Sequence, residues 1–339
     1  MLIGSGRERP ARIEDLIDSA LVARLDALDL RSRKIFTGRL QGERRSKKRG
    51  QSVEFDDYRD YVPGDDLRFI DWNAYARLDR LFIKLFLEEE DLALHVALDA
   101  SASMDAGSPN KLVFGSRIAM AMSYIGLVKN NRVGMTIFGL PTGARETGES
   151  RTAALGLAHL SDRRGRRHLR AAGRFLLESL WGSGGVGVRA GGAAPAPGAA
   201  FNDALVTIAR GRRGRGVMVV ISDFLVEDGY ERGLRALAAA GGYDTVCLQV
   251  LSPGEIDPQK ESESGLMGDL RLTDVESGKA AEVTMTAALV RQYRKRLETY
   301  CADLHSYCLA REMAHVLCRS DTPLETLILD TLRRRGVVG

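Results

Sequence analysis

The chain has 339 residues, of which 44% are hydrophobic and 28% charged, and this ordinary globular composition excludes disorder over its whole length. Its formal charge of +4 is too small to require a nucleic-acid partner. No apolar run approaches the roughly 18 residues of a membrane span, and the N-terminus becomes charged too early for a signal peptide. We therefore expect a soluble, cytoplasmic protein of about two domains, with peripheral attachment to a membrane as the alternative.

The cysteine and histidine patterns argue against a zinc site or a disulfide framework. None of the four cysteines has CxxC spacing, and none of the five histidines stands at metal-ligand spacing. We therefore expect reduced thiols, as in a cytosolic protein. His95 lies inside an apolar segment, where a hydrogen-bonded core histidine is the simplest interpretation. The cysteines are Cys247, Cys301, Cys308 and Cys318.

The first 91 residues stand outside the main pattern of the chain. Residues 1–51 are expected to form an N-terminal segment, with an amphipathic helix over 13–30 and a basic loop after it. Residues 52–91 are expected to form a small accessory β element with a strand over 80–87. We interpret the block Pro63–Trp72 as packing for this element, with a partner-docking face as the alternative.

From residue 92 the pattern alternates between short apolar strands and helices. Strands that alternate with helices, and that are apolar throughout, predict a doubly wound α/β domain around a mostly parallel sheet. We assign this domain to residues 92–252. The expected elements are strand 92–98, helix 110–129, strand 132–138, helix 168–181, helix 202–210, strand 217–222, helix 230–240 and strand 245–251.

The last segment, residues 253–339, is expected to pack back on this core. The sequence predicts a hairpin within 266–285, a long helix over 285–311, a strand over 313–318 and a helix over 322–335. We expect the hairpin to join the accessory β element described above.

Polar residues follow two of the expected parallel strands. Asp99, Ser101 and Ser103 come directly after the first strand, and Asp223 follows a later one in the same way. Open α/β sheets bind ligands beyond the carboxyl ends of their strands, near the point where the strand order reverses. Carboxylate and hydroxyl oxygens gathered there suit Mg²⁺. Strand-end Asp and Ser residues can equally cap the next helix or turn, and spacing alone does not choose between these roles.

Enzymatic motifs fit these residues poorly. A phosphatase of the haloacid-dehalogenase type needs a second Asp two positions after its strand-end Asp, where this chain has Ser101. The G-x-S-x-G elbow and the Walker A loop do not occur in the sequence. We therefore expect a protein that is not an enzyme. A Mg²⁺-dependent phosphoesterase that uses the strand-end carboxylates is the first alternative.

Three basic clusters stand out, at Arg44–Arg49, Arg163–Arg170 and Arg210–Arg215. Arginine-rich loops can contact phosphates, but no aromatic residues are interleaved here and no nucleic-acid-binding motif accompanies them. We interpret them as solvated loops or as docking surfaces for an acidic partner. A nucleic-acid-binding module is the second alternative function.

The chain also carries a series of separated motifs. They are Glu54-Phe55, Arg59, Tyr61, Pro63-Gly64-Asp65-Asp66, Arg68, Ile70-Asp71-Trp72, Ala76-Arg77, Leu81, Glu88–Glu90, Asp99-x-Ser101-x-Ser103-Met104, Arg132-Val133-Gly134, Phe138 and Ile221-Ser222-Asp223-Phe224. This series resembles the signature of the bacterial domain-of-unknown-function 58 family. The likeness runs from about residue 30 to 260, which makes it far more specific than any single motif.

The resemblance implies a von Willebrand factor A-like, Rossmann-type domain with a metal-ion-dependent adhesion site. In such a site the serines of D-x-S-x-S ligate Mg²⁺, and an acidic side chain of a partner completes the shell. By position, Ser101 and Ser103 would be direct ligands and Asp99 and Asp223 the carboxylates, with Mn²⁺ or Ca²⁺ as alternative cations. The family stands beside MoxR-type AAA+ ATPases, which implies a non-enzymatic, chaperone-like adaptor for a client that the sequence does not identify.

The chain departs from the family pattern in two places. The usual Thr before the helix that leads to Asp223 is replaced by Ala199, so the site lacks this hydroxyl. Asn202 and Asp203 are the candidates to replace it, although both could instead cap helix 202–210. Many relatives also carry N-terminal transmembrane helices, where this chain has a charged amphipathic helix.

Overall fold

The computed structural model describes residues 9–32, 54–87, 92–140, 156–182, 201–212, 214–258, 268–273 and 280–339. The chain divides into two compact units. Unit 1 contains Met1–Gly38 and Leu92–Gly339, and unit 2 contains Arg39–Asp91. The accessory segment expected from the sequence therefore lies within unit 2, and the α/β domain lies within unit 1.

Unit 1 is built on a mixed sheet, which has six strands among the described residues. Their spatial order is β10-β7-β6-β3-β4-β5, and all neighbours are parallel except β4 and β5. The expected α/β fold with a mostly parallel sheet is thus confirmed. The strands are β3 (Ala93–Asp99), β4 (Arg132–Phe138), β5 (Ala158–Arg163), β6 (Gly216–Ser222), β7 (Tyr243–Leu251) and β10 (Ala314–Arg319).

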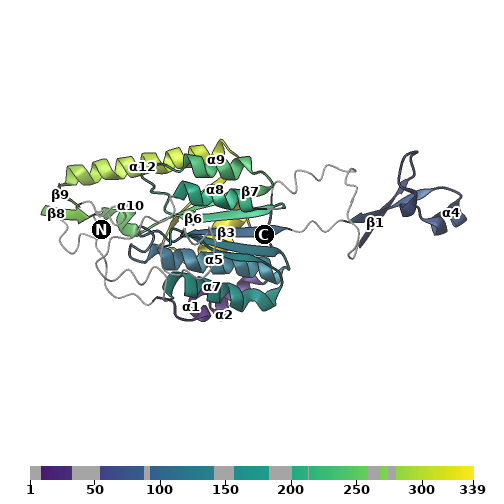
Figure 1. The fold of residues 1–339 in the computed structure, drawn as a ribbon, viewed down its shortest axis with the longest axis horizontal. Helices are drawn as coiled ribbons and strands as arrows, with labels where there is room; N and C mark the ends of the chain where they lie inside the picture. Colours follow the sequence, from purple (N-terminus) through teal and green to yellow (C-terminus); the bar gives the residue numbers. More distant parts are fainter. Residues whose placement is uncertain are drawn as a thin grey trace. The chain divides into compact units, whose positions relative to one another are not determined.

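Helices cover both faces of this sheet (Figure 1). Alternate residues of a strand point to opposite faces, so Leu94, Val96 and Leu98 pack on one side of β3 while Ala93 and Ala97 pack on the other. The first side is covered by α1 (Ile13–Leu16), α2 (Ser19–Leu25), α5 (Lys111–Val128) and α7 (Leu169–Trp181). The second is covered by α8 (Phe201–Gly211), α9 (Glu231–Ala239) and α12 (Ala287–Leu309).

The chain leaves the neighbouring strands β3 and β6 in opposite directions. These two strands are parallel neighbours, with Leu98 opposite Ile221 near their carboxyl ends. The chain leaves β3 toward α5 on one face and leaves β6 toward α9 on the opposite face. The strand order therefore reverses here, and open α/β sheets bind ligands at such a point.

Helix α5 is the central element of the first face. Its N-cap is Asn110, whose side-chain oxygen accepts a hydrogen bond from Val113 N at 3.0 Å, so the helix begins at Lys111, one residue after the expected start. Among the described residues, only α5 has the length and apolar composition to span a membrane, and 83% of that stretch is buried inside the fold. The expectation that no apolar stretch approaches this length was therefore wrong for α5, whose burial is that of a core helix.

Two expectations for unit 1 were wrong in detail. Residues 13–30 do not form one helix, because Ile17 is extended and Asp18 starts a new helix by accepting a hydrogen bond from Leu21 N at 2.7 Å. Strand β5 was not expected, because it is a largely exposed edge strand whose sequence has no run of apolar residues.

The segment after β7 begins with a single helical turn, α10 (Pro253–Ile256). Strands β8 (Gly268–Thr273) and β9 (Ala280–Met285) then pair antiparallel in a two-stranded sheet of their own. They fall in unit 1, whereas residues 52–91, which we expected them to join, fall in unit 2. After α12 and β10, a π-helical turn over Thr326–Leu332 packs into the core.

Unit 2 contains an antiparallel pair of strands, β1 (Glu54–Asp60) and β2 (Phe82–Leu87), with α4 (Trp72–Leu78) between them in sequence. Asp71 starts α4 by accepting hydrogen bonds from the backbone N–H groups of residues 73 and 74. Ile70 is buried beside Ile83, in line with a packing role for this block. Trp72, however, is 61% exposed, and its ring contacts that of Tyr75 in the same helix edge-on.

Candidate metal centre

Asp99 is the last residue of β3 and lies at the carboxyl edge of the sheet. Its Oδ1 accepts a hydrogen bond from Ser101 N at 2.9 Å, and its Oδ2 accepts one from Ser222 Oγ at 2.7 Å. The side chain is almost fully buried. Burial and the nearby charge of Asp223 raise the pKa of Asp99 to about 7.

The loop after Asp99 brings two hydroxyl groups together. Ser101 Oγ and Ser103 Oγ lie 3.0 Å apart. The side chain of Met104, at the end of this loop, is buried. The loop passes close to Gly139, which has a φ of +75°. A Cβ at Gly139 would come within 2.8 Å of Ser101 N and 3.1 Å of Asp99 Oδ1, so glycine is required there for the loop to adopt this position.

A tight turn at residues 222–224 positions Asp223. The Ser222 hydroxyl accepts a hydrogen bond from Phe224 N at 2.9 Å, and Gln249 Nε2 donates to the carbonyl of Asp223 at 3.1 Å. Phe224 has a φ of +56°, a left-handed conformation that costs energy for a bulky residue. Tyr300 of α12 donates a hydrogen bond to the Phe224 carbonyl and so supports this conformation.

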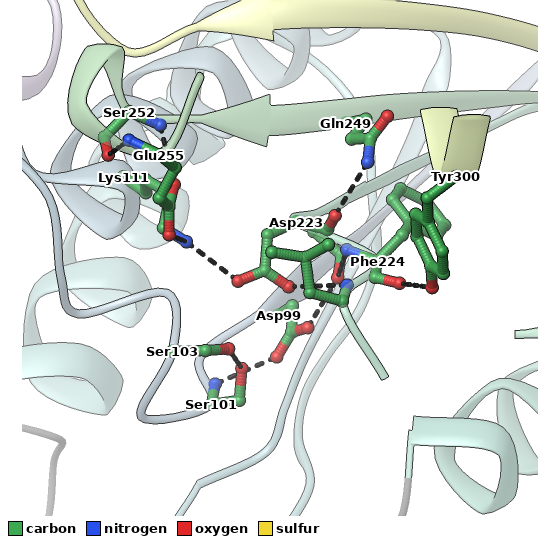
Figure 2. Close-up of polar contacts among 12 residues, drawn as sticks. Asp99, Ser101, Ser103, Lys111, Asp223, Phe224, Gln249, Ser252, Glu255 and Tyr300 are labelled. Carbon is green, nitrogen blue, oxygen red and sulfur yellow. Dashed lines mark hydrogen bonds and ion pairs between the residues drawn. The ribbon is translucent and has the colours of Figure 1, made fainter. Parts of the chain in front are cut away.

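Asp223 also belongs to a buried ion-pair group. Lys111 Nζ lies 2.9 Å from Asp223 Oδ2 and 2.5 Å from Glu255 Oε1, and the Lys111 side chain is 0% exposed. Burial alone would lower the pKa of Lys111, but the two carboxylates outweigh it and raise the pKa. Figure 2 shows Lys111 and Glu255 on one side of Asp223, and Asp99, Ser101 and Ser103 on another.

The structure brings together four of the six residues that the sequence singled out. Asp99, Ser101, Ser103 and Asp223 lie close to one another at the carboxyl ends of β3 and β6.

Asn202 and Asp203 are engaged elsewhere. Asn202 bonds to Gly229 O at 2.8 Å and to Gly233 N at 2.7 Å, and Asp203 pairs with Arg232. Both side chains thus hold α8 against the loop before α9 and α9 itself. Ala199 lies outside the described residues.

The sequence analysis missed three residues that shape this site: Ser222, Lys111 and Glu255. Ser222 directly precedes Asp223, but a serine at a strand end gave no sign of its bond to Asp99. Lys111 did carry a signal, because a lysine in the first turn of a helix opposes the helix dipole and calls for a nearby carboxylate. Glu255 forms a capping box with Ser252, which hides its second role.

The chemistry of the donor set fits a small divalent cation. All four side chains offer oxygen, which Mg²⁺ prefers, and two adjacent ligands of an octahedral Mg²⁺ at about 2.1 Å lie about 3.0 Å apart. Ser101 Oγ and Ser103 Oγ have that separation. Among the described residues, no group of three or more His, Cys, Asp or Glu side chains is arranged to hold a metal.

Two of the basic clusters have residues at the amino ends of the parallel strands, opposite the end that carries the candidate metal centre. Arg163 ends β5 opposite Val133, near the start of β4, and Arg215 directly precedes β6. Both positions are at the amino ends of the parallel strands, whereas Asp99 and Asp223 are at the carboxyl ends. The basic loops are therefore separate from the candidate metal centre. The cluster Arg44–Arg49 lies outside the described residues.

A family model described as "Protein of unknown function DUF58" matches residues 57–302, which is more than half of the chain. Among similar proteins, "Uncharacterized protein Rv1480" of Mycobacterium tuberculosis is 28% identical over 292 residues, which cover 86% of this chain and 82% of that protein. "Uncharacterized protein Mb1516" of Mycobacterium bovis has the same identity and the same coverage.

A solved structure titled as the conserved hypothetical protein BatB from Bacteroides thetaiotaomicron is 15% identical and covers 73% of this chain and 97% of that one. Its TM-score is 0.38.

Proposed function

The chain belongs to the DUF58 family, and we propose that it is a non-enzymatic adaptor that captures an acidic side chain of a partner protein through a divalent cation. Asp99, Ser101, Ser103 and Asp223 would hold this cation, with Mg²⁺ as the first choice and Mn²⁺ or Ca²⁺ as alternatives. The sheet around them would be of the von Willebrand factor A type.

The meeting of two carboxylates and two hydroxyls at one point of the sheet carries this proposal. These side chains come from the ends of two neighbouring parallel strands, where the chain turns to opposite faces. Open α/β sheets bind ligands there. The set offers only oxygen donors, and its negative charge favours a cation over a neutral or anionic ligand.

The surrounding residues would hold the donors in place before a partner arrives. Ser101 N and Ser222 Oγ fix both oxygens of the Asp99 carboxylate, so little side-chain freedom remains to be lost on binding. The turn at 222–224 fixes the backbone of Asp223. When bound, the cation would supply an open coordination position that a carboxylate of the partner can fill.

Binding rather than catalysis is proposed because of the neighbours of Asp99. The residue at the acid–base position is Ser101, whose hydroxyl bonds to Ser103 rather than to a basic group. Lys111, which could act as a base, is engaged with two carboxylates.

The partner in this proposal is a MoxR-type AAA+ ATPase, acting with this chain on a client complex in the cytoplasm or at the membrane surface. Its support is the resemblance of the motifs from Glu54 to Phe224. An ATPase that presents an exposed acidic side chain would meet the chemical requirement of the site.

The proposal is tested by measuring Mn²⁺ binding with electron paramagnetic resonance and by capturing the purified ATPase in Mg²⁺ or in EDTA. We expect the wild type to bind one Mn²⁺ and to retain the ATPase only with the cation present. The double variant Asp99→Ala/Ser101→Ala should lose both properties, because it removes one carboxylate and one hydroxyl from the set.

The matched control removes the same kinds of group from α8. Asp203→Ala/Thr207→Ala deletes a carboxylate that pairs with Arg232 and a hydroxyl that bonds back to its own helix, so it should behave as the wild type. Retention of the ATPase by every protein in EDTA would overturn cation-dependent capture. Turnover of a phosphoester that requires Asp99 would instead support the phosphoesterase alternative.

A further inference from the structure

Lys111 is an unusual residue to find in the core of unit 1. It is the first residue of α5, its side chain is 0% exposed, and its positive charge lies at the helix end that favours negative charge. A buried ammonium group is costly unless it is paired. Asp223 and Glu255 supply that pairing, at 2.9 and 2.5 Å.

The two carboxylates that hold Lys111 differ in their surroundings. Glu255 is fixed by a capping box, in which Ser252 N donates to Glu255 Oε2 at 2.8 Å. Its carbonyl accepts a hydrogen bond from Tyr293 of α12 at 2.9 Å. Asp223, by contrast, reaches into the candidate metal centre, where its charge acts on Asp99. Lys111 therefore pairs with two different kinds of residue: Glu255, which has a structural role, and Asp223, which is a candidate metal ligand.

The charges explain why this sharing matters. Asp223 and Glu255 both pair with Lys111, and the charge of Asp223 also acts on Asp99, so a metal ion near Asp99 would draw on the same Asp223 carboxylate. Attraction to Asp223 is thus divided between the ammonium group and any bound metal ion.

We propose that the ammonium group of Lys111 competes with the metal ion for the Asp223 carboxylate and so regulates the cation affinity of this site. It pairs with Asp223 in the absence of a metal ion and shifts its ion pair toward Glu255 when one is bound. Glu255 then keeps the ammonium group of Lys111 paired, which leaves the Asp223 carboxylate available to the metal ion. The inference rests on the proposed function, because it takes Asp223 to be part of a cation site.

The experiment compares Mn²⁺ affinity in four proteins: the wild type, Glu255→Gln, Lys111→Met/Glu255→Gln and the control variant Asp257→Asn. Glutamine can keep the capping box, and methionine replaces the stem of the lysine with a flexible apolar chain. The double variant loses one positive and one negative charge, so the net charge around the site stays the same. A change in affinity then reports the loss of the competitor rather than a change in overall charge.

The two variants should shift the affinity in opposite directions. Glu255→Gln leaves Lys111 with Asp223 alone and should weaken Mn²⁺ binding by about tenfold or more, as expected for a close charge. Lys111→Met/Glu255→Gln should strengthen it by a similar factor. Asp257→Asn removes a carboxylate that pairs with Arg294 two residues from Glu255, and it should weaken binding less than Glu255→Gln does.

Each outcome separates this inference from the proposed function. If the wild type binds Mn²⁺ and the double variant binds it equally or more weakly, Lys111 is only a structural ion pair and the inference is overturned. If only the double variant binds Mn²⁺, the inference holds and the proposed function of the wild type fails. If no protein binds Mn²⁺, both fail. Denaturant unfolding in EDTA and in Mn²⁺ verifies that each variant is folded, and should the double variant not fold, the comparison of Glu255→Gln with Asp257→Asn decides.

Discussion

The carboxyl group of Asp99 is 4% exposed, and its pKa is raised to about 7 by burial and by the charge of Asp223. An ordinary Asp titrates near 4, so between about pH 4 and pH 7 the folded protein holds a proton that the unfolded chain has released. Stability then falls as pH rises through this window, because the folded state binds more protons. This pH dependence is expected of the metal-free protein, in which no metal ion neutralises the Asp99 carboxylate.

We predict that Asp99→Asn removes this dependence. In EDTA, the free energy of unfolding of the wild type minus that of the variant should fall between pH 5 and pH 7 by at most about 1.4 kcal/mol per pH unit, the value for one proton. Denaturant titrations at several pH values measure it.

The prediction is stated as a difference in free energy of unfolding between wild type and variant because two buried histidines change the stability with pH in the opposite direction in both proteins. Burial lowers the pKa of His95 to about 3 and that of His315 to about 4, so both lend stability that increases with pH up to about 6.5. A difference that is flat with pH would contradict the raised pKa of Asp99.

At the scale of single elements, α5 shows how closely a helix can lie on the sheet. Gly126 faces β3 and β4, and a Cβ there would come within 2.6 Å of Val133 Cγ2 and 3.3 Å of Leu94 Cδ2. The absence of a side chain at this position therefore sets the distance between helix and sheet.

We predict that Gly126→Ala destabilises the protein although alanine is the better helix former. Overpacking costs about 1–3 kcal/mol, and the gain in helix propensity offsets about 1 kcal/mol of it. The matched variant is Gly211→Ala, at the end of α8, where a Cβ meets nothing within 4 Å. This change should leave stability unchanged or raise it by up to about 1 kcal/mol. Equal effects of the two variants in urea unfolding would contradict the close approach of α5.

The expected elements of unit 1 were those with long apolar patterns. Strand β4 has the predicted bounds, and α8 and α12 differ from expectation by only a few residues. Strand β5 and helix α4 were missed because their residues are largely exposed and so carry no apolar period.

At the scale of the whole molecule, the two units differ in how many apolar side chains they bury. Both large clusters of buried apolar side chains belong to unit 1. Among the described residues of unit 2, only Ile70 and Ile83 are buried apolar residues, whereas Trp72 and Leu78 are more than 60% exposed. The six strands of the sheet and the four residues of the candidate metal centre therefore all belong to unit 1.

We predict that unit 1 folds without unit 2. Replacing residues 39–91 by a flexible Gly/Ser linker should leave cooperative unfolding, and the Mn²⁺ affinity of the site should stay within about twofold, since no buried contact of the clusters is lost and loop length has a small effect on closure entropy. Circular dichroism during urea unfolding measures the first property, and electron paramagnetic resonance the second. Loss of cooperative unfolding would mean that unit 2 is part of the folding unit.

The sequence by itself determined the α/β class, the strands of the core and the meeting of Asp99 with Asp223. These depend on local apolar patterns and on one topological rule, that the carboxyl ends of parallel strands share an edge.

The partners of those residues were decided only by the tertiary structure. Lys111 and Glu255 are 144 positions apart, and Ser222 and Asp99 are 123 apart. A hydrogen bond or ion pair over such a separation leaves no periodic trace in the sequence, because it depends on side-chain direction and burial once the sheet has formed. The sequence did set residues 52–91 apart, but only the tertiary structure decided that strands β8 and β9 belong to unit 1 rather than to that segment.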